Sequence, residues 1–99
     1  MSESDPYAAL EQLYPALIAQ MPPRFNSHEF ILRLAYQHQG LYIRALAQYA
    51  DSDHPFMIAH ARLARALARF PDLVRYVGDE PSVDIFGHTG AAALWRRVK

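Results

Sequence analysis

The sequence predicts one compact, mostly α-helical domain: a bundle of about four to five helices followed by a β-hairpin. Three observations predict this fold class. The 99 residues suffice for a single hydrophobic core, and 52% of them are hydrophobic, which excludes a disordered chain. Apolar residues recur at helical spacing as far as residue 70. All four valines lie beyond that point, where β-branched residues favour strands. We expect a single domain, with a leader helix in residues 1–23 and a body in residues 24–99.

The leader begins with a helix start signal. Asp5 can cap exposed amide groups, and Pro6 occupies the first helical position, where its missing N–H costs nothing. Pro15 should kink or divide this helix, and the two prolines at 22–23 should end it. Its apolar residues could pack on the chain's own domain or on a second copy in a dimer. They are Tyr7, Leu10, Leu13, Tyr14, Leu17 and Ile18.

A capping box marks the start of the second helix. Asn26 and Glu29 stand three residues apart, with Phe25 and Phe30 at the positions of a hydrophobic staple. We predict a helix over residues 27–39, ended by the glycine at position 40.

Two further helices and a hairpin follow. We predict helices over residues 41–50 and 55–70, separated by a turn of Asp, Ser, His and Pro residues. Residues 73–77 and 83–87 read as two strands joined by a turn at 78–82. Thr89 could then cap a final short helix over residues 90–98.

This order of elements resembles a winged helix-turn-helix domain. Residues 27–39 would be the supporting helix, 41–50 the first helix of the motif, 55–70 the recognition helix and 73–87 the wing. In that family the recognition helix enters the major groove of DNA and the wing touches phosphate or the minor groove. The resemblance rests on element order and not on a specific motif.

Charge is distributed unevenly in a chain whose formal net charge is zero. Residues 1–23 hold three acids and no base, whereas residues 24–99 hold ten bases and seven acids. Nine of the ten bases are arginine, whose planar five-donor group suits phosphate and carboxylate partners. A neutral total argues against a general nucleic-acid coat. It leaves room for one localised basic surface.

The residues that carry the DNA-binding hypothesis lie on the fourth helix and the wing. Arg62, Arg65 and Arg69 share one helix face, and Arg75 lies on the wing. We expect these four side chains to contact phosphate of double-stranded DNA in a regulatory, non-enzymatic role. The competing interpretation is that the helix face is merely solvated. A second basic cluster, Arg96, Arg97 and Lys99, would complement the dipole of the final helix.

An alternative function is protein–protein interaction on the same fold. Met57 and Ile58 should be exposed if the neighbouring apolar residues of the fourth helix point inward, and they would then form a partner-binding surface. A homodimer is one version of this alternative.

Catalysis, metal binding and cofactors are not expected. The chain has no cysteine, and no two of its five histidines stand four residues apart as zinc ligands on a helix do. No nucleophile with a partnering base is evident. The polar, acidic start lacks the features of a secretory signal, and no apolar run reaches membrane-spanning length. We therefore expect a cytoplasmic protein without a membrane partner or a small-molecule substrate.

Overall fold

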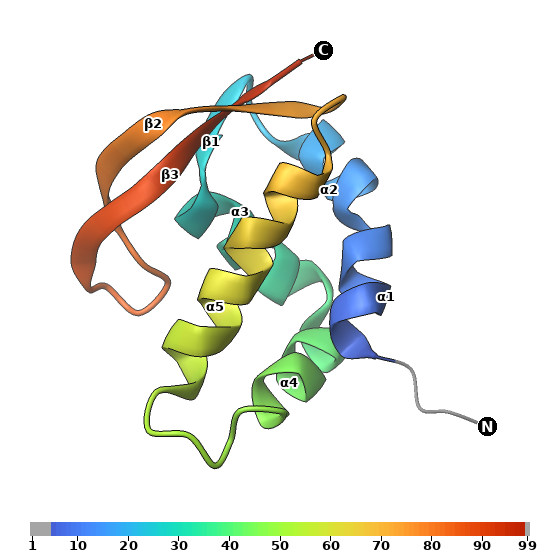
Figure 1. Cartoon of the computed structure of the whole chain (residues 1–99), viewed down its shortest axis with the longest axis vertical. Coiled ribbons are helices and arrows are strands. Elements are labelled where there is room, and N and C mark those ends of the chain that lie inside the picture. Colours follow the sequence, from blue (N-terminus) through green and yellow to red (C-terminus); the bar gives the residue numbers. More distant parts are fainter. Residues whose placement is uncertain (1–4, 99) are drawn as a thin grey trace.

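The fold combines a layer of helices with a small sheet. The computed structural model describes residues 5–98, in which five α-helices, one 3-10 helix and a three-stranded antiparallel sheet surround one hydrophobic core. Figure 1 shows that the sheet lies on one side of the helices. The chain is therefore a mixed α/β domain, and the expectation of a mostly α-helical bundle understated its β content. Within residues 5–98, no helix has both the length and the apolar composition needed to cross a membrane.

The leader forms two short helices, α1 (Pro6–Gln12) and α2 (Tyr14–Gln20). Pro15 at the start of α2 divides them, as its position predicted, and the Asp5 carboxylate accepts a hydrogen bond from the Tyr7 amide at 3.0 Å. The apolar side chains of both helices are buried in the chain's own core: Tyr7, Leu10, Tyr14, Leu17 and Ile18. The leader is thus an integral part of this domain's core.

The capping box predicted at Asn26 is confirmed. The Asn26 side chain accepts a hydrogen bond from the Glu29 amide at 2.9 Å, and the Glu29 carboxylate accepts one from the Asn26 amide at 2.8 Å. This box starts α3 (Ser27–Gln37), which ends two residues earlier than expected. The next helix, α4 (Gln39–Ala47), begins almost at once. The glycine at position 40 therefore lies inside α4, and the prediction that it ends the preceding helix was wrong.

The fourth predicted helix is present as α5 (Pro55–Ala66), extended by the 3-10 turn η1 (Leu67–Arg69). Its predicted range of 55–70 holds to within one residue because a tighter 3-10 turn commonly closes an α-helix. The α4 helix ends three residues before the predicted boundary, and residues 48–54 connect it to α5.

The hairpin is longer than predicted and turns at a different place. Strand β2 (Val74–Val83) contains all of the predicted turn at 78–82, and the observed turn at residues 84–88 leads into β3 (Thr89–Arg97). Gly78 does not turn the chain. It lies at a bulge in the ladder with a φ of +151°, a conformation that glycine adopts at little cost. Pro81 is tolerated because β2 is an edge strand.

The predicted final helix over residues 90–98 is wrong, because these residues form β3. Their alanines favour a helix locally. However, β3 is the central strand in the order β1–β3–β2, where β1 is the short strand Arg24–Asn26 that the sequence did not indicate. Pairing on both edges satisfies the β3 backbone, and Trp95 is buried against Phe25 of β1. Tertiary pairing therefore overrides local propensity.

Candidate nucleic-acid interface

The three arginines predicted on one helix face do meet in space. Arg62, Arg65 and Arg69 line a small hollow of about 290 Å³. It lies between α5 and η1 on one side and α1 on the other. Glu11 of α1 and Tyr49 of the α4–α5 connection complete its lining. The helical spacing therefore predicted correctly that these side chains share one face. It did not predict that α1 packs beside that face.

Arg62 is held by two aromatic side chains. Its guanidinium carbon lies 3.9 Å from the centroid of the Tyr7 ring, and Nη1 donates a hydrogen bond to the Tyr49 hydroxyl at 3.0 Å. That hydrogen bond raises the pKa of Arg62, and partial burial opposes the rise. The side chain is only partly exposed. Arg62 therefore joins the leader to α5 and has limited freedom to reach a ligand.

Arg69 and Arg65 are more exposed to solvent than Arg62. Arg69 Nη1 lies 2.8 Å from a carboxylate oxygen of Glu11, in an ion pair whose arginine side chain is 71% exposed. A surface pair of this kind is weak and uses only part of the guanidinium, so four of its five N–H donors stay available. Arg65 is exposed. Both residues can contact a phosphate outside the domain.

A second set of arginines lies across the sheet. Arg96 of β3 is the register partner of Arg24 on β1 and of Arg75 on β2. Residues directly opposite one another on neighbouring strands point to the same face, with Cβ atoms roughly 5 Å apart. All three residues are exposed. They form a row of positive charge across the three strands, which we call the arginine row (Arg24, Arg96 and Arg75).

Within the part of the chain that the structure describes, the arginine row carries no compensating acid. Residues 5–98 contain one arginine–carboxylate pair, Arg69 with Glu11, and one contact of His88 Nδ1 with Asp84 at 3.7 Å that is an ion pair only when the histidine is protonated. Neither involves the row. Like charges placed directly opposite one another destabilise a sheet. Arg96 is the most affected, because it has an arginine on each side. An arrangement that costs stability in the free protein is consistent with a partner that supplies the missing negative charge.

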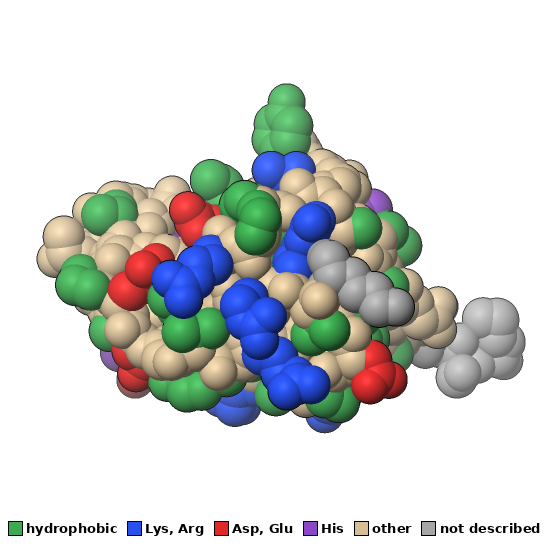
Figure 2. All heavy atoms as spheres, turned by 90° about the horizontal axis from the view of Figure 1, so that it is seen from above, with side chains coloured by type: hydrophobic (Ala, Val, Ile, Leu, Met, Phe, Trp, Pro, Cys, Tyr) green, Lys and Arg blue, Asp and Glu red, His purple; other side chains and the backbone are tan. Residues whose placement is uncertain are grey.

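The row and the end of α5 lie at one end of the molecule. Strands β1 and β2 begin there, β3 ends there, and α5 runs toward it (Figure 1). Figure 2 views this end from above and shows lysine and arginine side chains gathered into a band, with acidic side chains toward its margins. The zero net charge of the chain thus conceals a basic surface.

The sequence missed Arg24 and Arg96 as partners of Arg75. The members of the row lie on three strands, and one of these strands was not predicted while another was taken for a helix.

Arg97, grouped with Arg96 in the sequence, has a different role: Nη1 donates to the carbonyl oxygens of Ala19 and Met21 at 3.0 and 2.9 Å, at the end of α2. The predicted interaction of this cluster with a helix dipole fails because β3 replaces the helix. Lys99 lies outside the described residues.

The residues predicted to bind a protein partner are exposed. Met57 is 65% exposed and Ile58 is 36% exposed, both in the first half of α5. Met57 lines a groove of about 670 Å³ between α5 and the β2–β3 hairpin. Four of the five histidines also line this groove: His28, His54, His60 and His88. Within residues 5–98, no group of three or more histidines and carboxylates is arranged to hold a metal ion.

Comparison of the chain with protein-family models, with curated proteins and with solved structures finds no match.

Proposed function

We propose that this chain is a non-enzymatic, regulatory DNA-binding protein that contacts the phosphate backbone of duplex DNA through the arginine row. The observation that carries the proposal is the row itself, three exposed arginines in direct register with no acid of residues 5–98 paired to them. Arginine binds phosphate with a planar fork of donors, and adjacent strands space the three groups along one line. Arg65 on α5 and Arg69 on η1 extend the surface.

The proposal includes a winged-helix-like arrangement. It is supported by the succession of α3, α4 and α5 followed by a long hairpin, and by the sheet order β1–β3–β2. In such an arrangement α5 would be the recognition helix. The exposed side chains of its first half are apolar, namely Phe56, Met57 and Ile58. Few direct base contacts are therefore expected, and phosphate contacts would supply most of the affinity.

Individual arginines have different roles in this proposal. Arg75, predicted from the sequence, contacts phosphate together with Arg24 and Arg96. Arg65 and Arg69 contact phosphate at the edge of the band. Arg62 is a positioning residue, because Tyr7 and Tyr49 hold its guanidinium within the domain.

The test is fluorescence anisotropy of a labelled duplex titrated with protein at several salt concentrations. Three row contacts predict a slope of log Kobs against log salt of about −2.7, and contacts from Arg65 and Arg69 would steepen it. Single variants Arg24→Gln, Arg75→Gln and Arg96→Gln should each reduce the magnitude of the slope by about 1. Arg44→Gln is the matched control. It removes the same charge from an exposed position on α4, at the opposite end of the molecule (Figure 1).

The result separates the row from a general charge effect. The proposal is wrong if Arg44→Gln weakens binding as much as Arg96→Gln, or if the wild-type protein does not shift the duplex even at low salt. If Arg65→Gln abolishes binding while the three row variants do not, the helix face is the DNA-binding surface and the row is not.

A second candidate function is a protein-interaction module on the same fold. The exposure of Met57 and Ile58 beside an open groove favours it. The two functions differ in their response to salt, because apolar contacts do not weaken as salt rises. They also use different surfaces, so one chain can carry both.

A further inference from the structure

The groove between α5 and the hairpin is built from four parts of the chain. The start of α3 forms its floor, α5 and the residues before it form one wall, and the hairpin turn with β3 forms the other wall. Its volume of about 670 Å³ is within the range of ligand-binding clefts. Small side chains from both walls, Ala61, Ala64, Ala91, Ala92 and Ala93, keep it open.

Aromatic rings hold the two walls at a fixed separation. The ring centroids of Phe56 on α5 and Phe86 in the hairpin turn lie 4.5 Å apart, edge to face. Phe86 also lies nearly parallel to the His60 ring, at 6.1 Å and 10°. His60 in turn is hydrogen-bonded to the Tyr42 hydroxyl through Nε2, at 2.6 Å. Phe56 and Phe86 remain 43% and 49% exposed, so the aromatic wall faces solvent.

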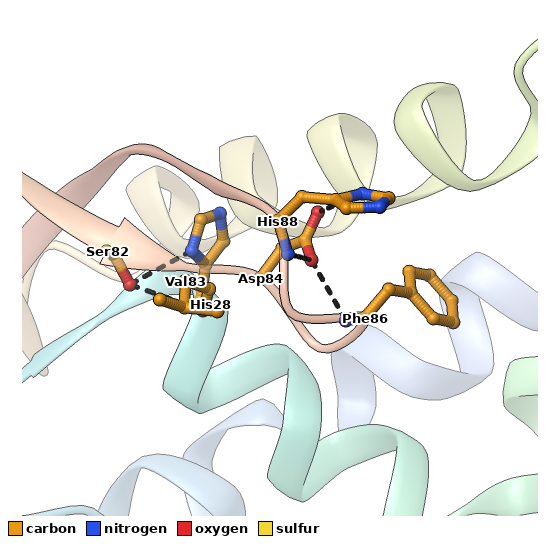
Figure 3. Close-up of polar contacts among 6 residues, drawn as sticks. All are labelled: His28, Ser82, Val83, Asp84, Phe86 and His88. Carbon is orange, nitrogen blue, oxygen red and sulfur yellow. Dashed lines mark hydrogen bonds and ion pairs between the residues drawn. The ribbon is translucent and has the colours of Figure 1, made fainter.

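The hairpin turn is shaped by one carboxylate. Asp84 Oδ1 accepts hydrogen bonds from the amides of Phe86 and His88, both at 2.9 Å (Figure 3). These hydrogen bonds lower the pKa of Asp84, so it stays ionised at neutral pH. Next to this turn, His28 Nδ1 on the floor of the groove lies 3.0 Å from the Ser82 hydroxyl of β2. The hairpin wall is thus joined to the floor before any ligand is present.

The charge of the groove is opposite to that of the arginine row. Its described lining contains two carboxylates, Asp53 and Asp84, and no lysine or arginine. The other titratable groups around it are His28, His54, His60 and His88 of the lining, and Tyr42 behind His60. Burial lowers the pKa of His60, which favours its neutral form. His88 Nδ1 lies 3.7 Å from Asp84 Oδ2. The lining is therefore largely apolar, and its two carboxylates have no lysine or arginine beside them.

We infer that this groove binds a segment of a partner protein in which an apolar side chain is flanked by lysine or arginine. The apolar side chain packs against the exposed surfaces of Phe56, Met57 and Phe86, and the cation lies beside Asp53 or Asp84. Charge complementarity selects this occupant, because an acidic segment would meet the two carboxylates with no lysine or arginine in the described lining to offset them. The arginine row is a separate surface, so the partner can be held while DNA is bound.

The test uses two labelled synthetic peptides of equal length at pH 7.5. One carries the core Lys-Leu-Phe-Lys, and the other carries Glu-Leu-Phe-Glu. Fluorescence polarisation should show saturable binding of the lysine peptide and none of the glutamate peptide. Heteronuclear NMR should place the shifted amides at residues 53–57 and 84–88.

Protein variants test the same assignment. The double variant Asp53→Asn with Asp84→Asn should weaken binding of the lysine peptide about 3- to 10-fold. The side-chain carbonyl of Asp84→Asn can still accept the hydrogen bonds from the turn. Phe86→Ala should weaken binding of the same peptide about 10-fold, because it removes an aromatic anchor. The matched controls are Asp51→Asn with Asp72→Asn, which changes charge equally, and Tyr36→Ala, which removes an exposed ring. None of these control residues lines the groove, and all three are exposed.

The assignment is overturned if the lysine peptide does not bind, or if both peptides bind equally well. It is also overturned if the control variants weaken binding as much as the groove variants do. Circular dichroism and thermal melting of each variant establish that it is folded, and Asp84→Asn alone provides a milder variant if the double variant is unstable.

Discussion

The guanidinium carbon of Arg62 lies over the Tyr7 ring, 3.9 Å from its centroid. These residues are 55 positions apart in the chain, on α5 and α1. The Tyr7 hydroxyl donates to the Ala45 carbonyl at 2.8 Å, so the same tyrosine also fastens α1 to α4. One cation on the predicted DNA-contacting face is thus part of the structure that holds the leader in place.

Replacing Arg62 should therefore affect stability more than DNA binding. Arg62→Ala removes a cation–π contact and a hydrogen bond to Tyr49, which together should cost about 1–2 kcal/mol. Arg65→Ala on the exposed part of the same face should change stability by less than about 0.5 kcal/mol. Urea denaturation of both variants measures the difference. Equal losses would show that the contact with Tyr7 contributes nothing to folding.

The central residue of the arginine row should have opposite effects on stability and on binding. Arg96→Gln relieves repulsion from Arg24 and Arg75, so the free protein should become more stable by about 0.5 kcal/mol, while its affinity for duplex DNA falls. Thermal melting and anisotropy on the same preparation measure the two changes. A variant that is both less stable and unchanged in DNA binding would contradict the role of the row.

Asn26 should be more important than a simple helix cap. Besides its capping bonds, Asn26 donates two hydrogen bonds from its side-chain Nδ2, to the Glu80 carboxylate at 2.8 Å and to the Ser82 hydroxyl at 3.1 Å. These bonds link the start of α3 to β2. Asn26→Ala should cost about 2–3 kcal/mol. Asp5→Ala removes a cap without such cross-links and should cost about 1 kcal/mol. Chemical denaturation compares them, and an equal cost would show that the cross-links to β2 add nothing.

Alkaline pH should unfold the protein through its buried tyrosines. Burial raises the pKa of Tyr7 to about 12 and that of Tyr14 well above its usual range. The Tyr14 hydroxyl donates to the Leu63 carbonyl at 2.6 Å. Because the unfolded tyrosines ionise near pH 10, stability should be intact below that pH and should fall as the pH rises toward 12.

Tyr14→Phe should shift this alkaline transition to higher pH, at a cost of about 1 kcal/mol near neutrality. Circular dichroism and tyrosinate absorbance, followed together from pH 9 to 12, test this. The exposed Tyr36→Phe is the control, and it should leave the transition unchanged. If the two variants titrate alike, burial of Tyr14 does not couple ionisation to unfolding.

The helical part of this protein was readable from the sequence because its signals are local. The cap at Asp5, the capping box at Asn26 and Glu29, and the proline at position 15 each act within one turn of helix, and the structure confirms all three. The face shared by Arg62, Arg65 and Arg69 follows from helical periodicity alone. The same periodicity placed Met57 and Ile58 at the surface.

The sheet was decided by tertiary structure, because each strand depends on partners distant in the chain. Residues 90–97 favour a helix by composition, yet they form the central strand because β1 and β2 pair with both of their edges. Strand β1 has only three residues and cannot be detected without its partner.

The proposed sites follow the same division. The resemblance in element order singled out Arg75 as a candidate on the predicted wing, but it could not place Arg24 and Arg96 beside it, since strand register is set by pairing across 72 residues of chain. The histidines are likewise far apart in the sequence, and no local pattern relates them. Four of them line one groove because the hairpin packs beside α5. Periodicity fixes which side chains share a helix face. Long-range backbone pairing fixes which surfaces those faces meet, because its hydrogen bonds join segments that no local pattern relates.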